Sequence, residues 1–221
     1  MKTEELRINA AILLLAAFVY IALLSPLGVI RAAGSSAAPV FRTADEGRTG
    51  LVIRLSWDAG ALNDIRQKLA GAGVRTTFAV SPALAEKDPS EVAELYYEGH
   101  EIVLLIDDES TDIGSAVDLL ERITGERPRA AVADDLIARK IATEARKHGL
   151  RIAVPTVDLD AARGSAEEIT ARFCSISPEG AFCACDPTAQ FADALPDLLE
   201  KIKNMGLDIA PLHKMLYNEA V

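Results

Sequence analysis

From residue 50 onward the chain alternates short apolar runs with amphipathic segments, and this alternation restricts its fold more than any other feature. The short apolar runs predict buried parallel strands, and the segments between them predict helices that cover the sheet. Such repeated units build either a β/α barrel or an open doubly wound sheet. Seven strands are expected, at residues 51–57, 76–80, 101–106, 130–133, 151–155, 181–185 and 207–211.

The expected helices have recognisable starts and ends. Asp88 followed by Pro89 is typical of a helix N-terminus, whereas Gly125 and Gly149 are typical of helix ends. Pro196 falls inside the last expected helix and predicts a kink or a break after Leu195. The helices are expected at residues 63–70, 89–97, 113–124, 136–147, 166–173 and 189–204.

The N-terminal part of the chain differs in character from the rest. Residues 8–30 carry no charge and are long enough to span a bilayer as a helix, so residues 1–30 are predicted to be one membrane anchor. A cleaved signal peptide is the alternative, because small residues follow at positions 32–34. Residues 31–48, rich in Ala, Gly and Ser, are expected to form a flexible linker to one domain at residues 49–221.

Charge excludes one class of partner. The net charge of −10 at pH 7 and the absence of a basic stripe argue against a nucleic acid or an anionic polymer. The basic residues that flank the apolar run do not decide its orientation, because Lys2 and Arg7 precede it while Arg31, Arg42 and Arg48 follow.

Carboxylates follow five of the seven expected strands, at the edge where ligands bind in β/α folds. They can form an acidic ligand pocket, or they can cap the helices that begin there. We expect Asp134, Asp135 and Asp186 to act mainly as caps. An all-oxygen magnesium or calcium site is a further alternative, with ligands from Asp58, Asp107, Asp108 and Glu109.

Two segments resemble motifs of the NodB-type polysaccharide deacetylases. Leu55-Ser56-Trp57-Asp58-Ala59-Gly60 is similar to that family's Leu-Thr-Phe-Asp-Asp-Gly, and Gly99-His100-Glu101-Ile102 is similar to its Gly-His-Glu-Ile-Gly-Asn-His-Thr-x-x-His. Segments 74–80, 125–128, 155–158 and 194–196 follow in the family's order. The resemblance covers about residues 50–218 and implies a distorted seven-stranded β/α barrel, preceded here by one transmembrane helix.

The same resemblance implies that the metal site is lost. The family's metal ligands are one Asp and two His, and their places are taken by Ala59, Leu105 and Glu109. The place of the family's catalytic base is retained as Asp58, while Ala131 falls where an Arg is usual. We therefore expect no metal cofactor. The candidate catalytic residues are Asp58, Asp158 and Asp186, and the candidate binding residues are Trp57 and Glu109.

Cysteines and histidines add little to this site. Cys174, Cys183 and Cys185 are expected either to include one disulfide from Cys174 or to be buried thiols. His100 is expected to be structural, and His213 is the one histidine with a route to the pocket.

Two functions follow as hypotheses. The first is a single-pass domain outside the cytoplasm that binds a cell-wall glycan or an envelope protein without metal-dependent catalysis, its location being implied by the family resemblance. The alternative is an active, divergent carbohydrate deacetylase that hydrolyses an amide C–N bond, using Asp58 with an unorthodox divalent-metal site or with no metal.

Overall fold

The structure, a computed structural model, describes residues 38–45, 47–57, 60–160 and 164–217. These residues fall within one structural unit, residues 37–221. The predicted anchor at residues 1–30 lies outside the described residues. Within the described ranges, no helix combines the length and the apolarity that a membrane span needs.

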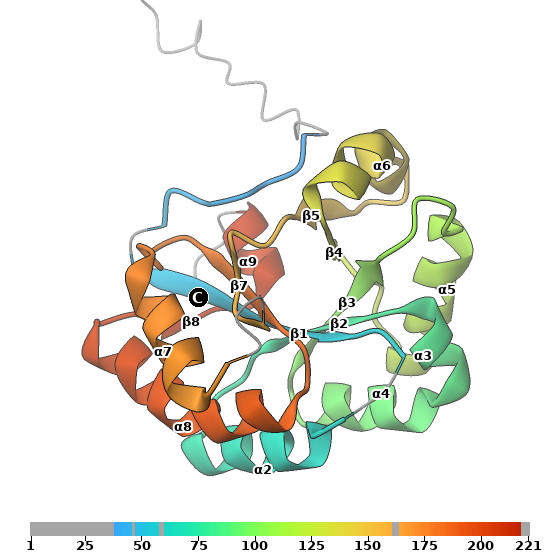
Figure 1. The fold of residues 1–221 in the computed structure, drawn as a ribbon. Coiled ribbons are helices and arrows are strands. Elements are labelled where there is room, and N and C mark those ends of the chain that lie inside the picture. Colours follow the sequence, from blue (N-terminus) through green and yellow to red (C-terminus); the bar gives the residue numbers. More distant parts are fainter. Residues whose placement is uncertain (1–37, 46, 58–59, 161–163, 218–221) are drawn as a thin grey trace, which may run out of the picture. The chain divides into compact units, whose positions relative to one another are not determined.

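A parallel sheet forms the wall of a half-barrel (Figure 1). Its seven strands lie in the order β5-β4-β3-β2-β1-β7-β6, and β8 pairs with the first residues of β1. Every expected strand is present, and β6 adds a short strand that the sequence did not indicate. The bounds are β1 Arg48–Leu55, β2 Thr77–Val80, β3 Glu101–Ile106, β4 Ala130–Ala133, β5 Arg151–Ala153, β6 Val157–Asp158, β7 Phe182–Cys185 and β8 Asp208–Ile209.

Six of the helices were expected, and two short ones were not. The short helices, α3 and α9, cover too few turns to produce a periodic pattern in the sequence. Ser81 begins α3 by accepting a hydrogen bond of 3.1 Å from the backbone N–H of Leu84. The bounds are α2 Leu62–Ala72, α3 Pro82–Lys87, α4 Pro89–Tyr97, α5 Ile113–Thr124, α6 Asp135–Lys147, α7 Ala166–Ser175, α8 Ala189–Asn204 and α9 Leu212–Tyr217.

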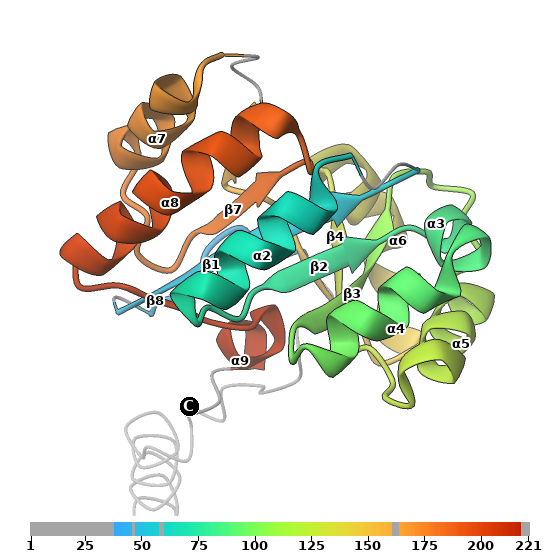
Figure 2. The same cartoon turned by 90° about the horizontal axis from the view of Figure 1, so that it is seen from below.

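Helix α8 continues through Pro196, so the break expected after Leu195 does not occur. Proline has no N–H to offer the carbonyl group four residues earlier, which belongs to Ala192. The Nζ of Lys68 on α2 donates a hydrogen bond of 2.9 Å to that carbonyl oxygen. Figure 2 shows α2 and α8 side by side along the sheet, the arrangement that brings Lys68 to this position.

The two faces of the sheet pack against different partners. On β1, Leu51, Ile53 and Leu55 belong to the core formed with the outer helices. Val52 points to the opposite face and belongs to a second apolar cluster, which fills the half-barrel. Residues of α9 join this inner cluster, which comprises Val52, Ala79, Val103, Leu105, Ala130, Val132, Ala153, Phe182, Ala184, Ala210, Leu212, Met215 and Leu216.

Residues 38–43, which we call the N-terminal strap, lie on the open side of the half-barrel between β5 and β7 (Figure 1). Val40 pairs in parallel with Ala153, and Arg42 pairs in antiparallel fashion with Ala181. These residues were expected to belong to a flexible linker at residues 31–48. From Val40 onward the strap is instead held by backbone hydrogen bonds, because it supplies partners to the exposed edge of the sheet.

Candidate functional site

A cavity of about 510 Å³ opens at the carboxyl ends of the strands. Ligand sites in parallel β/α folds occur at this edge. Its wall combines apolar residues with charged ones from several strand ends. The lining residues are Phe41, Arg54, Ser56, Leu105, Ile106, Asp107, Val132, Ala133, Asp134, Asp135, Val154, Pro155, Asp158 and Asp186.

Arg54 lies at the centre of the charged part of this cavity. It follows Val52 on the inner face of β1, and its guanidinium reaches carboxylates at the ends of β6 and β7. Its Nε donates to Oδ1 of Asp186 at 2.8 Å, and its two Nη atoms donate to Asp158 at 3.2 and 3.3 Å. Nη2 also donates to Asp160 at 3.3 Å. One guanidinium thus joins three carboxylates.

Arg54 was not among the site residues expected from the sequence. A signal was present, because Arg54 is the one charge in the run Leu51-Val52-Ile53-Arg54-Leu55. A charge inside a strand that is buried on both faces requires a partner. Asp158 and Asp186 supply it, and their positions relative to Arg54 depend on strand order, which the sequence does not reveal.

The charges of this cluster affect one another. Burial lowers the pKa of Arg54, but the charges and hydrogen bonds of Asp186 and Asp158 raise it by more. The net result is a pKa above the ordinary value. Burial, together with the neighbouring carboxylates of Asp186 and Asp158, raises the pKa of Asp160 to about 6, although the Asp186 N–H and Arg54 oppose the shift. Because Asp107, Asp134 and Asp135 also line the cavity, acidic groups outnumber the cation there.

Among the predicted site residues, Asp158 and Asp186 come together on Arg54. Asp58 and Ala59 lie outside the described residues. Trp57 is 65% exposed and does not belong to the cavity wall; the Lys87 ammonium lies 5.3 Å from its ring centroid. Glu109 forms an ion pair with Lys140 and does not line the cavity.

Helix capping accounts for only some of the carboxylates. Asp134 caps α6 by accepting a hydrogen bond of 2.8 Å from the N–H of Ile137. Asp135 lies in the first turn of α6 and pairs with Arg139 at 2.6 Å. The expectation that Asp186 is a cap is wrong, because Thr188 caps α8 and Asp186 is engaged by Arg54.

The donor set does not fit the metal site of the deacetylases that the sequence resembles. Leu105 is 4% exposed, belongs to the inner apolar cluster and has no electron pair to donate. Ala131 is buried in β4, and the Glu109 carboxylate is already paired with Lys140. Over the described residues, no cluster of three or more His, Cys, Asp or Glu side chains is arranged to hold a metal ion.

His100 and Glu101 serve the fold at the opposite end of the half-barrel. Nδ1 of His100 accepts a hydrogen bond of 3.2 Å from the N–H of Thr76, and the ring packs edge-on against Phe78. Glu101 accepts from the backbone N–H groups of Leu212 and His213, which begin α9. His213 also contacts Glu101 through Nδ1 at 2.8 Å, so it lies away from the candidate cavity.

The cysteines are free thiols in the structure. Cys174 is exposed, while Cys183 and Cys185 are buried in β7. Burial raises the pKa of Cys183 to about 11 and that of Cys185 well above the ordinary value. Cys183 and Cys185 therefore agree with the expectation of buried thiols, whereas the exposed Cys174 does not.

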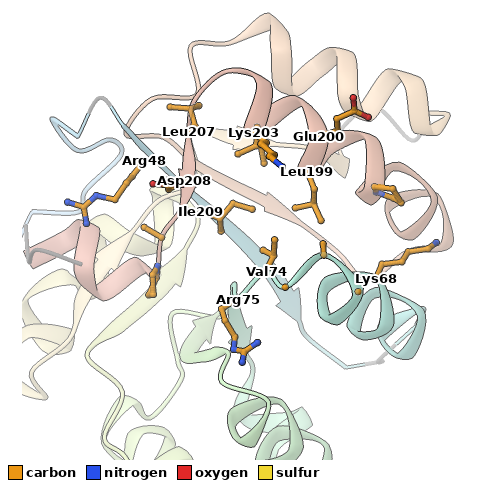
Figure 3. Close-up of a pocket in the computed structure, with 17 residues that line it drawn as sticks. Arg48, Lys68, Val74, Arg75, Leu199, Glu200, Lys203, Leu207, Asp208 and Ile209 are labelled. Atoms are coloured by element: carbon orange, nitrogen blue, oxygen red, sulfur yellow. The ribbon is translucent and has the colours of Figure 1, made fainter.

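A larger cavity of about 1020 Å³ lies where β1 begins, between the C-terminal ends of α2 and α8 (Figure 3). Val74, Leu199 and Ile209 occupy its middle, and charged residues including Arg48, Lys68 and Arg75 lie around them. None of the candidate site residues lines it. Volume alone does not mark a site, so the smaller cavity with convergent charges is the candidate.

Comparisons with known proteins identify the fold. No protein-family model matches the chain, and no curated protein matches its sequence. Solved structures do match. A pseudoenzyme of carbohydrate esterase family 4 (CE4) from Bacillus anthracis superposes with a TM-score of 0.71 at 19% identity, covering 82% of this chain and 69% of that one.

Two further solved structures come from the same class. A peptidoglycan N-acetylglucosamine deacetylase superposes with a TM-score of 0.69 at 22% identity, covering 81% of this chain and 92% of that one. The family 4 carbohydrate esterase PdaA of Bacillus subtilis gives a TM-score of 0.69 at 14% identity, covering 83% and 87%. The chain therefore has the fold of the CE4 polysaccharide deacetylases, as the NodB-type resemblance implied.

Proposed function

We propose that this chain is a membrane-anchored domain outside the cytoplasm that binds a cell-wall glycan without metal-dependent hydrolysis. The observation that supports this most strongly is the guanidinium of Arg54, which pairs with the carboxylates of Asp158, Asp160 and Asp186. The positive charge that pairs with these carboxylates is thus the side chain of Arg54, and the apolar side chain of Leu105 lines the same cavity. Metal-assisted hydrolysis needs ligands to hold the ion that activates water, and Arg54 already engages each of these three carboxylates.

The choice of a glycan as ligand rests on the fold and on the cavity wall. One solved structure with this fold is described as a peptidoglycan deacetylase and another as a pseudoenzyme. Half-exposed carboxylates at the cavity, such as Asp158 and Asp186, are suitable acceptors for sugar hydroxyl groups. An envelope protein is the alternative partner.

Three measurements on the purified full-length chain test the proposal. The chain is incubated with Zn²⁺ or Co²⁺ and analysed for bound metal, and acetate release is measured with N-acetylglucosamine oligomers and with peptidoglycan. Binding of the same oligomers is measured by calorimetry. We expect oligomer binding with neither bound metal nor acetate release. Stoichiometric metal together with acetate release would overturn the proposal, and recovery of a protein partner without glycan binding would favour the alternative partner.

The location is tested separately. The full-length chain should stay with the membrane fraction after alkaline extraction, and a C-terminal tag should be digested when protease is added to intact cells whose outer layers are permeable. Release by alkali would contradict the anchor, and a protected tag would contradict the orientation.

A divergent carbohydrate deacetylase remains a second candidate because of Asp160. Its pKa of about 6 lies where a side chain can exchange protons near neutral pH. This function predicts acetate release from N-acetylglucosamine oligomers that is lost in Asp58→Asn and in Asp160→Asn. A wild-type chain that releases no acetate, with or without added metal, would eliminate this candidate.

A further inference from the structure

We propose that the N-terminal strap forms one wall of the ligand site and that Phe41 stacks against a sugar ring of the bound glycan. This inference rests on the proposed glycan-binding function. Phe41 lines the candidate cavity and is 39% exposed. Among the described residues that line the cavity, it is the one aromatic side chain.

Backbone bonds hold Phe41 in place from both sides. Val40 exchanges two hydrogen bonds with the edge of β5, because its N–H donates to Ile152 at 2.9 Å and its carbonyl accepts from Val154 at 2.8 Å. Beyond Phe41, the N–H of Thr43 donates to Gly180 at 2.9 Å. A contact surface that is already ordered loses little conformational entropy when a ligand binds.

Side chains add to this support. The guanidinium of Arg42 donates hydrogen bonds to the carbonyl oxygens of Ser177 and Glu179, at 2.7 and 2.5 Å. The hydroxyl of Thr156 donates to the carbonyl oxygen of Phe41 itself. The Arg139 guanidinium lies 5.8 Å from the centroid of the Phe41 ring. Arg42 does not line the cavity and is therefore a positioning residue.

One side of the cavity is apolar and the other is charged, and a pyranose ring likewise has an apolar C–H face and a polar edge of hydroxyl groups. Phe41 offers an apolar ring, which suits the C–H face of a sugar. Asp158 and Asp186 are 43% and 49% exposed, and they can accept hydrogen bonds from hydroxyl groups at the edge of the sugar. Within the described part of the chain, Oδ2 of Asp186 has no hydrogen-bond partner. The cavity volume of about 510 Å³ lies in the range of small-ligand sites.

The test measures binding of an N-acetylglucosamine tetramer to the full-length chain by calorimetry. We expect Phe41→Ala to weaken binding about tenfold and Phe41→Trp to retain it. Tyr97→Ala is the matched control, because Tyr97 is an aromatic residue with 79% exposure that lines a different cavity. Its affinity should equal that of the wild type, and the melting temperature of Phe41→Ala should stay close to that of the wild type.

A second variant tests the strap without removing the ring. Arg42→Met should weaken tetramer binding and accelerate hydrogen exchange at the amides of Val40 and Thr43, whereas a merely structural role would leave affinity unchanged. If the wild type binds the tetramer and both Phe41→Ala and Arg42→Met bind it equally well, the strap proposal is overturned while the proposed function stands. If the wild type does not bind the tetramer, glycan binding fails and this inference fails with it.

Discussion

The Nε of Arg54 donates a hydrogen bond of 2.8 Å to Oδ1 of Asp186, which connects the middle of the sheet to the carboxylate that follows β7. The side chain of Arg54 is only 21% exposed. Removal of the guanidinium would leave carboxylates without their cation in a partly buried place, a situation that is strongly destabilising.

Replacement of Arg54 by Met should therefore destabilise the fold. At pH 7.5 we expect a loss of about 3 kcal/mol in the free energy of unfolding, measured with urea. Lys147→Met is the control, because Lys147 makes an exposed pair with Glu144, and its loss should be about 0.5 kcal/mol or less. Equal losses for the two variants would contradict the structural role of Arg54.

Because of Asp160, the free energy of unfolding should depend on pH near neutrality. Its pKa in the folded state is about 6, above the ordinary value of 3.8, so the folded state holds this proton more tightly. Stability from this group is present below about pH 4 and is lost as the pH rises through about 6. Asp160→Asn should therefore gain stability relative to the wild type between pH 4 and pH 7, by at most about 3 kcal/mol.

Urea titrations at several pH values check this prediction. The difference between Asp160→Asn and the wild type should grow across the window from pH 4 to pH 7 and then level off. A difference that stays constant across this range would mean that Asp160 titrates normally in the folded chain.

Lys68 and Pro196 should be energetically coupled. Lys68 supplies the donor for the Ala192 carbonyl that Pro196 cannot supply, so Lys68→Met should cost about 1 kcal/mol in the wild-type background. In a Pro196→Ala background, the restored backbone N–H should remove most of this loss. A double-mutant cycle by urea denaturation measures the coupling.

Asp64→Ala is the control for that cycle, because Asp64 on α2 binds the same Lys68 ammonium at 2.8 Å but does not belong to α8. Its effect should be the same with Pro196 and with Ala at that position. No coupling between Lys68 and Pro196 would show that water satisfies the Ala192 carbonyl equally well.

Glu101 should control the stability of α9. It accepts from two backbone N–H groups at the start of this helix and from the Thr77 hydroxyl at 2.6 Å. Glu101→Ala removes the acceptor of the His213 N–H and leaves the Leu212 N–H with only Oγ1 of Thr77 at 3.3 Å, so it should cost about 2 kcal/mol. Hydrogen exchange should accelerate first at the amides of Leu212 and His213, and unchanged protection there would rule out this capping role.

Much of the fold was predictable because its signals are local. The seven expected strands and six expected helices follow from runs and periods inside single segments, and the helix start at Pro89 is marked by Asp88. The break that Pro196 indicated does not occur, because the local rule for proline takes no account of tertiary partners. Lys68 lies far away in the sequence and supplies the missing donor.

The site was predictable only in part. The positions of Asp158 and Asp186 after strands indicated the correct edge of the sheet. Their attachment to Arg54 depends on β1, β7 and β6 being neighbours, and strand order does not appear in a linear pattern. Phe41 was missed for the same reason. Its segment has the composition of a linker, yet it pairs with a strand more than a hundred residues later.

The strap also determines which bonds a force applied to the N-terminal side of the domain would load first. A pull on the chain before residue 38 would load the bonds between Val40 and β5 before it reached β1 in the core. Those few bonds lie beside Phe41, so force along the chain would move the cavity wall while the sheet stayed intact. Mechanical load on the chain before residue 38 would therefore displace this wall of the cavity before it disrupted the pairing of β1.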